Sequence, residues 1–164
     1  MITKSDVSLE NARISQTYCV FRKILVNCFN YFSNKMRNLQ KKLSIYSFET
    51  TCEKISEFLK SKNISVFTIV DHRENAVKVG LTLRPEKVIF FGSPLLGTHL
   101  MEEDPDIGLE LPSKVLVYQE NDLTYVVHRD YNELKDEFQL TESSEYIEKL
   151  ANLMKGIDNY ISAT

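Results

Sequence analysis

The residues with the most reactive side chains lie between Asp71 and Met101. Asp71 and His72 are adjacent, and a histidine next to a carboxylate can act as a general base or as a metal ligand. Arg84 precedes Pro85, which keeps it extended, so its guanidinium can bind a carboxylate or a phosphate through two hydrogen bonds. Two simpler roles are open as well: Asp71 can cap a helix that starts with His72, and Arg84 can pair with a nearby carboxylate.

A segment rich in glycine and proline follows, with Gly92, Ser93, Pro94, Gly97 and Thr98 in close succession. Glycine lets a ligand approach the backbone, and Thr98 offers a hydroxyl at a predicted helix start. The spacing matches neither a P-loop nor the dinucleotide-binding GxGxxG pattern. The segment is therefore expected to form either one wall of a ligand site or a rigid loop in a dimer.

Two functions follow from these residues. The leading hypothesis is a non-catalytic or weakly ligand-binding domain in which one polar pocket receives a small anionic molecule. The alternative is an enzyme in which His72, oriented by Asp71, is the acid/base and Arg84 holds the substrate. No nucleophile motif assigns a catalytic residue. The residues predicted to bind the ligand are Asp71, His72, Arg84, Gly92, Ser93, Gly97 and Thr98.

The cysteines and histidines indicate neither a metal site nor a cofactor. There are three of each, widely spaced, and no two cysteines form a CxxC pair. The chain is therefore expected to lack disulfides and to belong to the reduced cytoplasm. Cys52 lies on the apolar stripe of a predicted helix, which favours a role in the core over a role as nucleophile.

The elements that must position these residues alternate between strands and helices. Hairpins occur together with crossovers, which predicts an α+β fold with a mainly antiparallel sheet packed with helices. A single helical turn capped by Thr98 is expected before Pro105. The predicted strands are 43–48, 64–70, 87–91, 114–118 and 124–128, and the predicted helices are 50–62, 71–79, 130–138 and 147–161.

The first 42 residues differ from the rest. They contain eight basic and two acidic residues, a net charge of +6, whereas residues 43–164 carry −9. Apolar residues recur every three or four positions from Ile14 to Leu39, which predicts a long basic amphipathic helix. It could pack on its own domain, dock on a membrane surface or a partner, or precede a natural start at Met36. The acidic domain, 43–164, repels phosphate backbones, so no nucleic-acid partner is expected.

The motifs of residues 43–141 resemble those of the domain of unknown function 302 family. The similarity extends from Asp71-His72 to Leu100-Met101 and continues through Glu110-Leu111-Pro112 and the strand ending at Tyr118. It implies a compact α+β fold, usually assembled as a homodimer, with no agreed activity. Three residues depart from the family pattern, and the serine at position 93, for example, stands where the family more often has asparagine. These residues are Ser93, His99 and Ser113.

Overall fold

One antiparallel sheet organises the described part of the chain, which covers residues 38–138 and 140–162 of the computed structural model. Its strand order is β1-β5-β4-β3-β2. The strands are β1 (Leu39–Ser44), β2 (Ser65–Asp71), β3 (Glu86–Gly92), β4 (Ser113–Glu120) and β5 (Leu123–Arg129). The helices are α2 (Phe48–Ser61), α3 (His72–Lys78), α4 (Pro94–Glu103), α5 (Leu134–Glu137) and α6 (Ser144–Ile161), with 3-10 turns η1 (Pro105–Leu109) and η2 (Tyr131–Glu133). The predicted α+β class and antiparallel sheet are confirmed, whereas the predicted amphipathic helix lies almost entirely outside the described residues.

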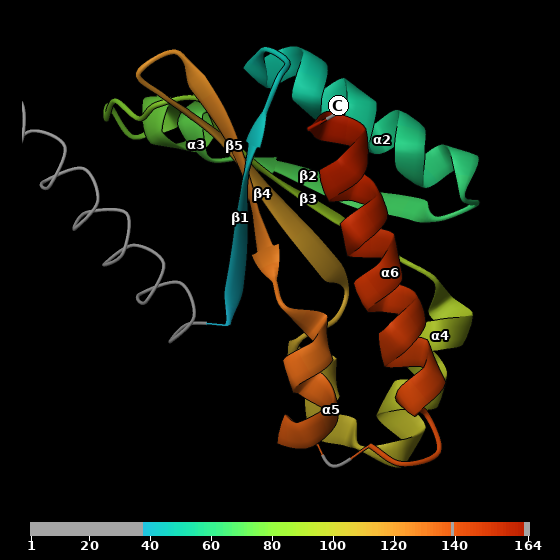
Figure 1. Ribbon diagram of the computed structural model, residues 1–164. Helices are drawn as coiled ribbons and strands as arrows, with labels where there is room; N and C mark the ends of the chain where they lie inside the picture. Colours follow the sequence, from blue (N-terminus) through green and yellow to red (C-terminus); the bar gives the residue numbers. More distant parts are fainter. Residues whose placement is uncertain (1–37, 139, 163–164) are drawn as a thin grey trace, which may run out of the picture. The chain divides into compact units, whose positions relative to one another are not determined.

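Helices α2 and α6 lie on the same side of the sheet (Figure 1). Their apolar stripes meet the inward side chains of β4 and β5, and the side chains at this contact are fully buried. Burial of this apolar surface is the main force that holds the two layers together. The fully buried residues of this contact include Ile55, Leu59, Val115, Val126 and Ile157.

Aromatic side chains lie on the opposite face of the sheet. Tyr118 and Tyr125 are direct neighbours on β4 and β5, and their rings stack with centroids 5.3 Å apart. The ammonium of Lys41 lies 4.1 Å from the Tyr125 ring centroid and 5.2 Å from that of Tyr118. A cation over two aromatic rings partly shields this face from water.

Turns and caps agree with the sequence in several places. Asn121 and Asp122 both have positive φ, 49° and 63°, as a tight hairpin turn between β4 and β5 requires. The Asp71 side chain accepts a hydrogen bond from the Glu74 backbone N–H and caps α3, as predicted. Gly80, at φ 75°, follows the end of that helix.

The first strand was predicted too late in the sequence. β1 ends at Ser44 because the Ser47 side chain caps α2 through the Thr50 backbone N–H, so the helix begins at Phe48. The apolar alternation at residues 45–48 therefore belongs to the turn and the first helical residue. β1 pairs with β5 from Leu39 to Ser44 and begins before the predicted domain start at residue 43.

Within residues 38–138 and 140–162, no helix has both the length and the apolar composition needed to cross a membrane.

Candidate functional site

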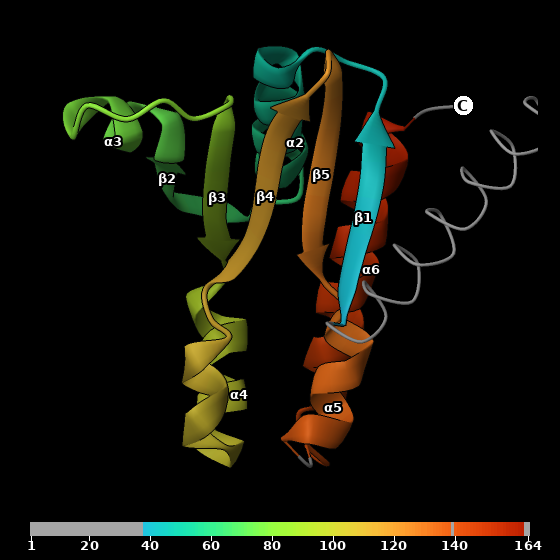
Figure 2. The same cartoon turned by 90° about the vertical axis from the view of Figure 1, so that its left-hand side faces the viewer.

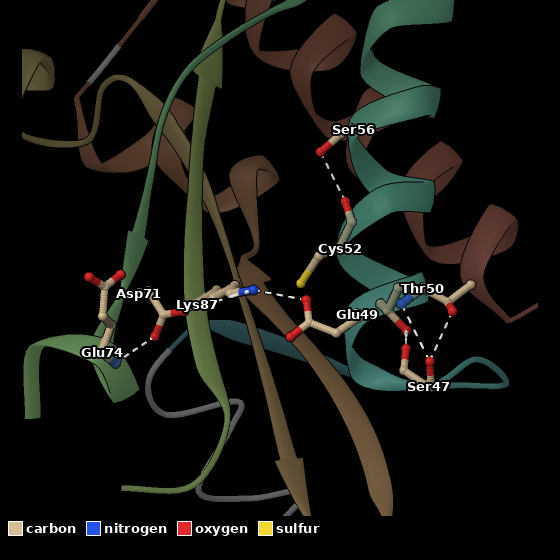
Figure 3. A network of polar contacts seen from close by, with 9 residues as sticks. Ser47, Glu49, Thr50, Cys52, Ser56, Asp71, Glu74 and Lys87 are labelled. Carbon is tan, nitrogen blue, oxygen red and sulfur yellow. Dashed lines mark hydrogen bonds and ion pairs between the residues drawn. The ribbon is translucent and has the colours of Figure 1, made fainter. Parts of the chain in front are cut away.

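Asp71 is held in a structural network at the start of α3. One of its oxygens accepts the Glu74 backbone N–H at 2.8 Å, and the other lies 3.8 Å from the ammonium of Lys87. Lys87 also bonds Glu49 on α2 at 2.8 Å, and Figure 3 shows its ammonium directed toward that carboxylate. The bond to Glu49 raises the pKa of Lys87 against the opposing effect of burial. The Asp71 carboxylate therefore caps a helix and takes part in a charge network.

Within residues 38–138 and 140–162, no hydrogen bond or ion pair joins His72 to Asp71 or to Arg84. His72 is half-buried in the first turn of α3, and its ring has no hydrogen bond within the described part of the chain. Arg84 is exposed, 3.0 Å from Glu86, and its guanidinium carbon lies 4.8 Å from the Tyr118 ring centroid. The Glu86 contact is an ion pair rather than an aligned hydrogen bond, because the same Glu86 oxygen has no hydrogen-bond partner. The Asp71 carboxylate contacts the Glu74 backbone N–H and the Lys87 ammonium instead of the His72 ring. The predicted hydrogen bond that would orient His72 is therefore not present.

Cys52 is buried on α2 and points toward the Lys87–Glu49 pair (Figure 3). Burial raises the pKa of its thiol to about 11, although Lys87 acts in the opposite direction. A thiol with so high a pKa stays protonated at neutral pH and is a poor nucleophile. The interpretation of Cys52 as a core residue is confirmed.

The glycine- and proline-rich segment is a helix rather than the predicted loop. α4 begins at Pro94, and Ser93 is its N-cap residue without a side-chain cap bond. Proline at the first helical position is favourable because its missing N–H would have no partner there. Gly97 and Thr98 therefore lie inside the helix, and the prediction that Thr98 caps a single turn is wrong.

The seven predicted site residues fall into two separate groups. Asp71 pairs with Lys87 near the beginning of β3, whereas Gly92 ends that strand. At the rise of an extended strand, the two ends of β3 lie on the order of 20 Å apart. Figure 2 shows α3 and α4 at opposite ends of β3. The prediction of one polar hollow is therefore wrong. Asp71, His72 and Arg84 lie near the start of β3, and the Gly92–Thr98 segment lies at its other end.

A large apolar pocket lies beside the Gly92–Thr98 segment. Its volume is about 830 Å³, and α4 and α6 form two of its walls, with further residues from the end of α2, the start of β2 and the loop before β4. Four of the predicted residues line it: Gly92, Ser93, Gly97 and Thr98. The apolar wall residues include Phe91, Leu96, Leu100, Leu111, Leu150 and Leu153.

Two lysines are the only charged residues among those described that line the pocket. Lys62 follows the last turn of α2, and Lys149 lies on α6 together with Asn152 and Gly156 at helical spacing. Lys149 makes an exposed ion pair with Glu145 at 3.4 Å. Glu145 itself does not line the pocket. The pocket therefore combines apolar walls with positive charge, although the domain around it is acidic.

Contacts join the C-terminal end of α4 to the segment just before α6, and so connect two walls of the pocket. Glu103 at the end of α4 accepts the backbone N–H groups of Thr141 at 2.6 Å and Ser143 at 2.8 Å, just before α6 begins. The bond from Thr141, aided by that from Ser143, lowers the pKa of Glu103 to about 2. The rings of His99 and Tyr146 stack at 5.2 Å between the same helices. These contacts set the spacing between the two walls.

A family model described as "Domain of unknown function DUF302" matches residues 39–157. The chain belongs to the DUF302 family. The crystal structure of an uncharacterized conserved DUF302 protein from Bacillus stearothermophilus superposes with a TM-score of 0.68 at 19% identity. That similarity covers 76% of this chain and 98% of the other, and it supports the DUF302 fold.

Two curated relatives match part of this DUF302 chain. Fluoride-specific ion channel FluC 1 of Brucella suis is 40% identical over 77 residues, which is 47% of this chain and 30% of the channel. Fluoride-specific ion channel FluC 2 of Brucella melitensis has the same identity over 77 residues and 28% of its length. The chain thus spans less than a third of the length of these relatives.

A second polar site in the DUF302 domain was missed from the sequence. His128 on β5 is buried, and its Nε2 lies 3.3 Å from both carboxylate oxygens of Asp158 on α6. Its Nδ1 lies 2.7 Å from the Arg129 carbonyl oxygen. Burial alone would lower the pKa of His128, but the bonds to Asp158 and to this carbonyl give a net rise. The imidazolium form can donate both N–H groups to these acceptors.

Sequence reasoning also missed Lys62 and Lys149. A single lysine in a charged helix carries no signal, and the pocket walls come from segments far apart in the chain. The helical spacing of Lys149, Asn152 and Gly156 does place them on one face of α6. Only the position of α4 shows that this face borders a cavity. Within the described residues, no cluster of three or more histidine, cysteine or acidic side chains could hold a metal ion.

Proposed function

We propose that this DUF302 domain binds a small molecule whose apolar part fills the pocket between α4 and α6. The observation that supports this most is the pocket itself: its volume of about 830 Å³ falls in the range of small-molecule sites. Its walls are mostly apolar, with leucine and aromatic side chains prominent, and a few hydroxyl and amide groups are placed among them. That combination holds an apolar body and orients it through few hydrogen bonds.

Binding without catalysis is the simpler function for this pocket. Among the described residues that line it there is no histidine, cysteine, aspartate or glutamate to act as acid, base or nucleophile. Its polar groups are mainly the hydroxyls of Ser93, Thr98 and Ser113 and the amide of Asn152. Of the seven residues predicted to bind a ligand, four line this pocket: Gly92, Ser93, Gly97 and Thr98.

We also propose that the protein is a homodimer in the cytoplasm. β2 is an edge strand, and its side chains Val66 and Ile69 are 37% and 46% exposed. An exposed apolar edge strand has free backbone groups that a second copy can pair with. Light scattering after size exclusion should give a dimer for the wild type and a monomer for Ile69→Lys. A monomeric wild type, or a dimer in both, contradicts β2 pairing.

A unique tryptophan can report on the pocket, because the chain has none. Phe67 lines the pocket, whereas Leu123 lies on β5 outside it, so Phe67→Trp is the reporter and Leu123→Trp the control. Titration with dodecan-1-ol should shift the fluorescence of Phe67→Trp to the blue and reach saturation. Decan-1-ol should bind on the order of 10-fold more weakly, because each buried methylene contributes about 0.8 kcal/mol.

A matched pair of variants at Gly97 tests whether the probe enters the cavity. A Cβ added at Gly97 would meet Leu111 at 3.6 Å and Met101 at 3.9 Å, ordinary contacts with two pocket residues. Gly97→Ala should therefore keep binding, whereas the longer side chain of Gly97→Leu should obstruct it. No saturable response in Phe67→Trp, or an equal response in Leu123→Trp, would contradict the proposed function.

A further inference from the structure

The charge around the pocket mouth points to a more specific ligand. Of the 23 acidic residues in the chain, 21 lie in residues 43–164, yet none of those described lines the pocket. The charged residues that do line it are Lys62 and Lys149. In a domain with net charge −9, a pocket lined by two lysines, with the exposed Glu145 carboxylate paired among the described residues only to Lys149, favours a negatively charged group there.

The two lysines are available to such a group. Lys62 forms no ion pair with any carboxylate of residues 38–138 or 140–162, and its ammonium lies 5.8 Å from the Phe58 ring centroid. Lys149 lies 4.8 Å from the Tyr146 ring centroid, and its ion pair with Glu145 is exposed on both sides, 55% and 62%. An exposed pair of this kind is weak, so a ligand anion can replace Glu145 at little cost.

Apart from the two lysines, the described lining offers only hydroxyl and amide groups and no further charged partner. The deeper wall residues Phe91, Leu100 and Leu150 are buried and apolar. An ionised group would lose its hydration there without compensation, so it must stay at the rim while an apolar chain enters. Ligand charge and ligand apolar surface are therefore expected at opposite ends of one molecule.

We infer that the pocket takes a free, single-chain amphipathic anion, with its chain between α4 and α6 and its carboxylate or similar head at Lys62 and Lys149. This inference rests on the proposed function, because it specifies the ligand of the same pocket. Monomeric amphiphiles fit better than bilayer surfaces, because the pocket is a concave cleft between walls from α4 and α6 rather than a flat apolar face.

The test compares three probes with the same chain and different heads, all below their micellar concentrations. Dodecanoate, dodecan-1-ol and dodecylamine are titrated into Phe67→Trp. Dodecanoate should bind on the order of 5-fold more tightly than dodecan-1-ol, as two weak exposed ion pairs allow, and dodecylamine should bind most weakly. Added salt should reduce the advantage of dodecanoate and leave dodecan-1-ol unchanged.

A charge-matched control separates a local effect from the overall field. In the Phe67→Trp background, Lys62→Met with Lys149→Met should bring the ratio of dodecanoate to dodecan-1-ol affinity close to one. Lys60→Met with Lys155→Met removes the same charge from α2 and the end of α6, but neither residue lines this pocket, so the ratio should persist.

The outcomes distinguish the inference from the proposed function. If dodecan-1-ol and dodecanoate bind equally, the anionic head is wrong and the apolar site stands. If neither binds, the proposed function fails as well. If both lysine pairs reduce the ratio alike, the preference comes from net charge and the assignment to Lys62 and Lys149 is overturned. A response to anionic phosphatidylglycerol vesicles without one to dodecanoate replaces the free amphiphile with a membrane surface.

Discussion

Replacement of Asp158 by asparagine should destabilise the protein far more in acid than in base. Asp158 is the carboxylate partner of buried His128, and their side chains are only 4% and 11% exposed. The pKa of His128 is raised in the folded state, because the bonds to Asp158 and the Arg129 carbonyl outweigh the effect of burial. The folded protein therefore binds this proton more tightly than the unfolded chain does.

The direction of the pH effect follows from this difference. The pair contributes its full stability below the unfolded pKa of histidine, about 6.5, and loses it as the pH rises through the raised folded value. At pH 5.5, Asp158→Asn leaves an imidazolium buried without its counter-charge. Removal of one partner of a buried ion pair costs about 3 kcal/mol. At pH 9 the imidazole is neutral, and the substitution changes a hydrogen bond to the charged Asp158 carboxylate, which costs about 1.5 kcal/mol.

Thermal unfolding followed by circular dichroism measures this prediction. With a shift of about 4 °C per kcal/mol, Asp158→Asn should lower the Tm by about 12 °C at pH 5.5 and about 6 °C at pH 9. Glu148→Gln, also on α6 but exposed, is the control and should change little at either pH. An equal loss at both values, or a larger loss at pH 9, would refute the charged His128–Asp158 pair.

Three further changes test the framework of the pocket. Glu103→Gln should lower the Tm at pH 7, and wild-type stability should fall as the pH drops from about 4.5 toward 2, because the folded pKa of Glu103 is about 2; a Tm unchanged by the substitution contradicts this role. Gly97→Ala should raise the free energy of unfolding by about 0.5–1 kcal/mol in urea, since it removes a helical glycine without a clash, and a loss would contradict the α4 geometry. Ile157→Ala should cost about 2–5 kcal/mol in the same assay, because Ile157 is fully buried, and a cost below about 1 kcal/mol would argue against the α6 core.

Much of the fold was predictable because its elements carry local signals. The short helix after Asp71 was found from its cap and from Gly80, and both signals act within a few residues. The turn at Asn121 and Asp122 was likewise found from residues that tolerate positive φ. Such features depend on neighbouring residues, so one sequence contains enough information to place them.

The candidate site was predicted only in part because it depends on distant contacts. Gly92 and Arg84 are close in sequence, yet β3 separates them by most of its length. An extended strand carries its two ends far apart, and no residue pattern states which end faces a cavity. The error at Thr98 has a local cause: Gly97 suggested a loop, but Pro94 is an equally strong signal for a helix start.

The ligand site can be located directly with nuclear Overhauser effects between bound dodecanoate and the leucine methyl groups of the wild-type protein. The pocket between α4 and α6 predicts contacts from the chain methyls to Leu100 and Leu150, and from the carbons next to the head to the side chain of Lys149. Contacts confined to Leu43 or Leu123, which lie outside the pocket, or no contacts at a saturating concentration, would contradict the site.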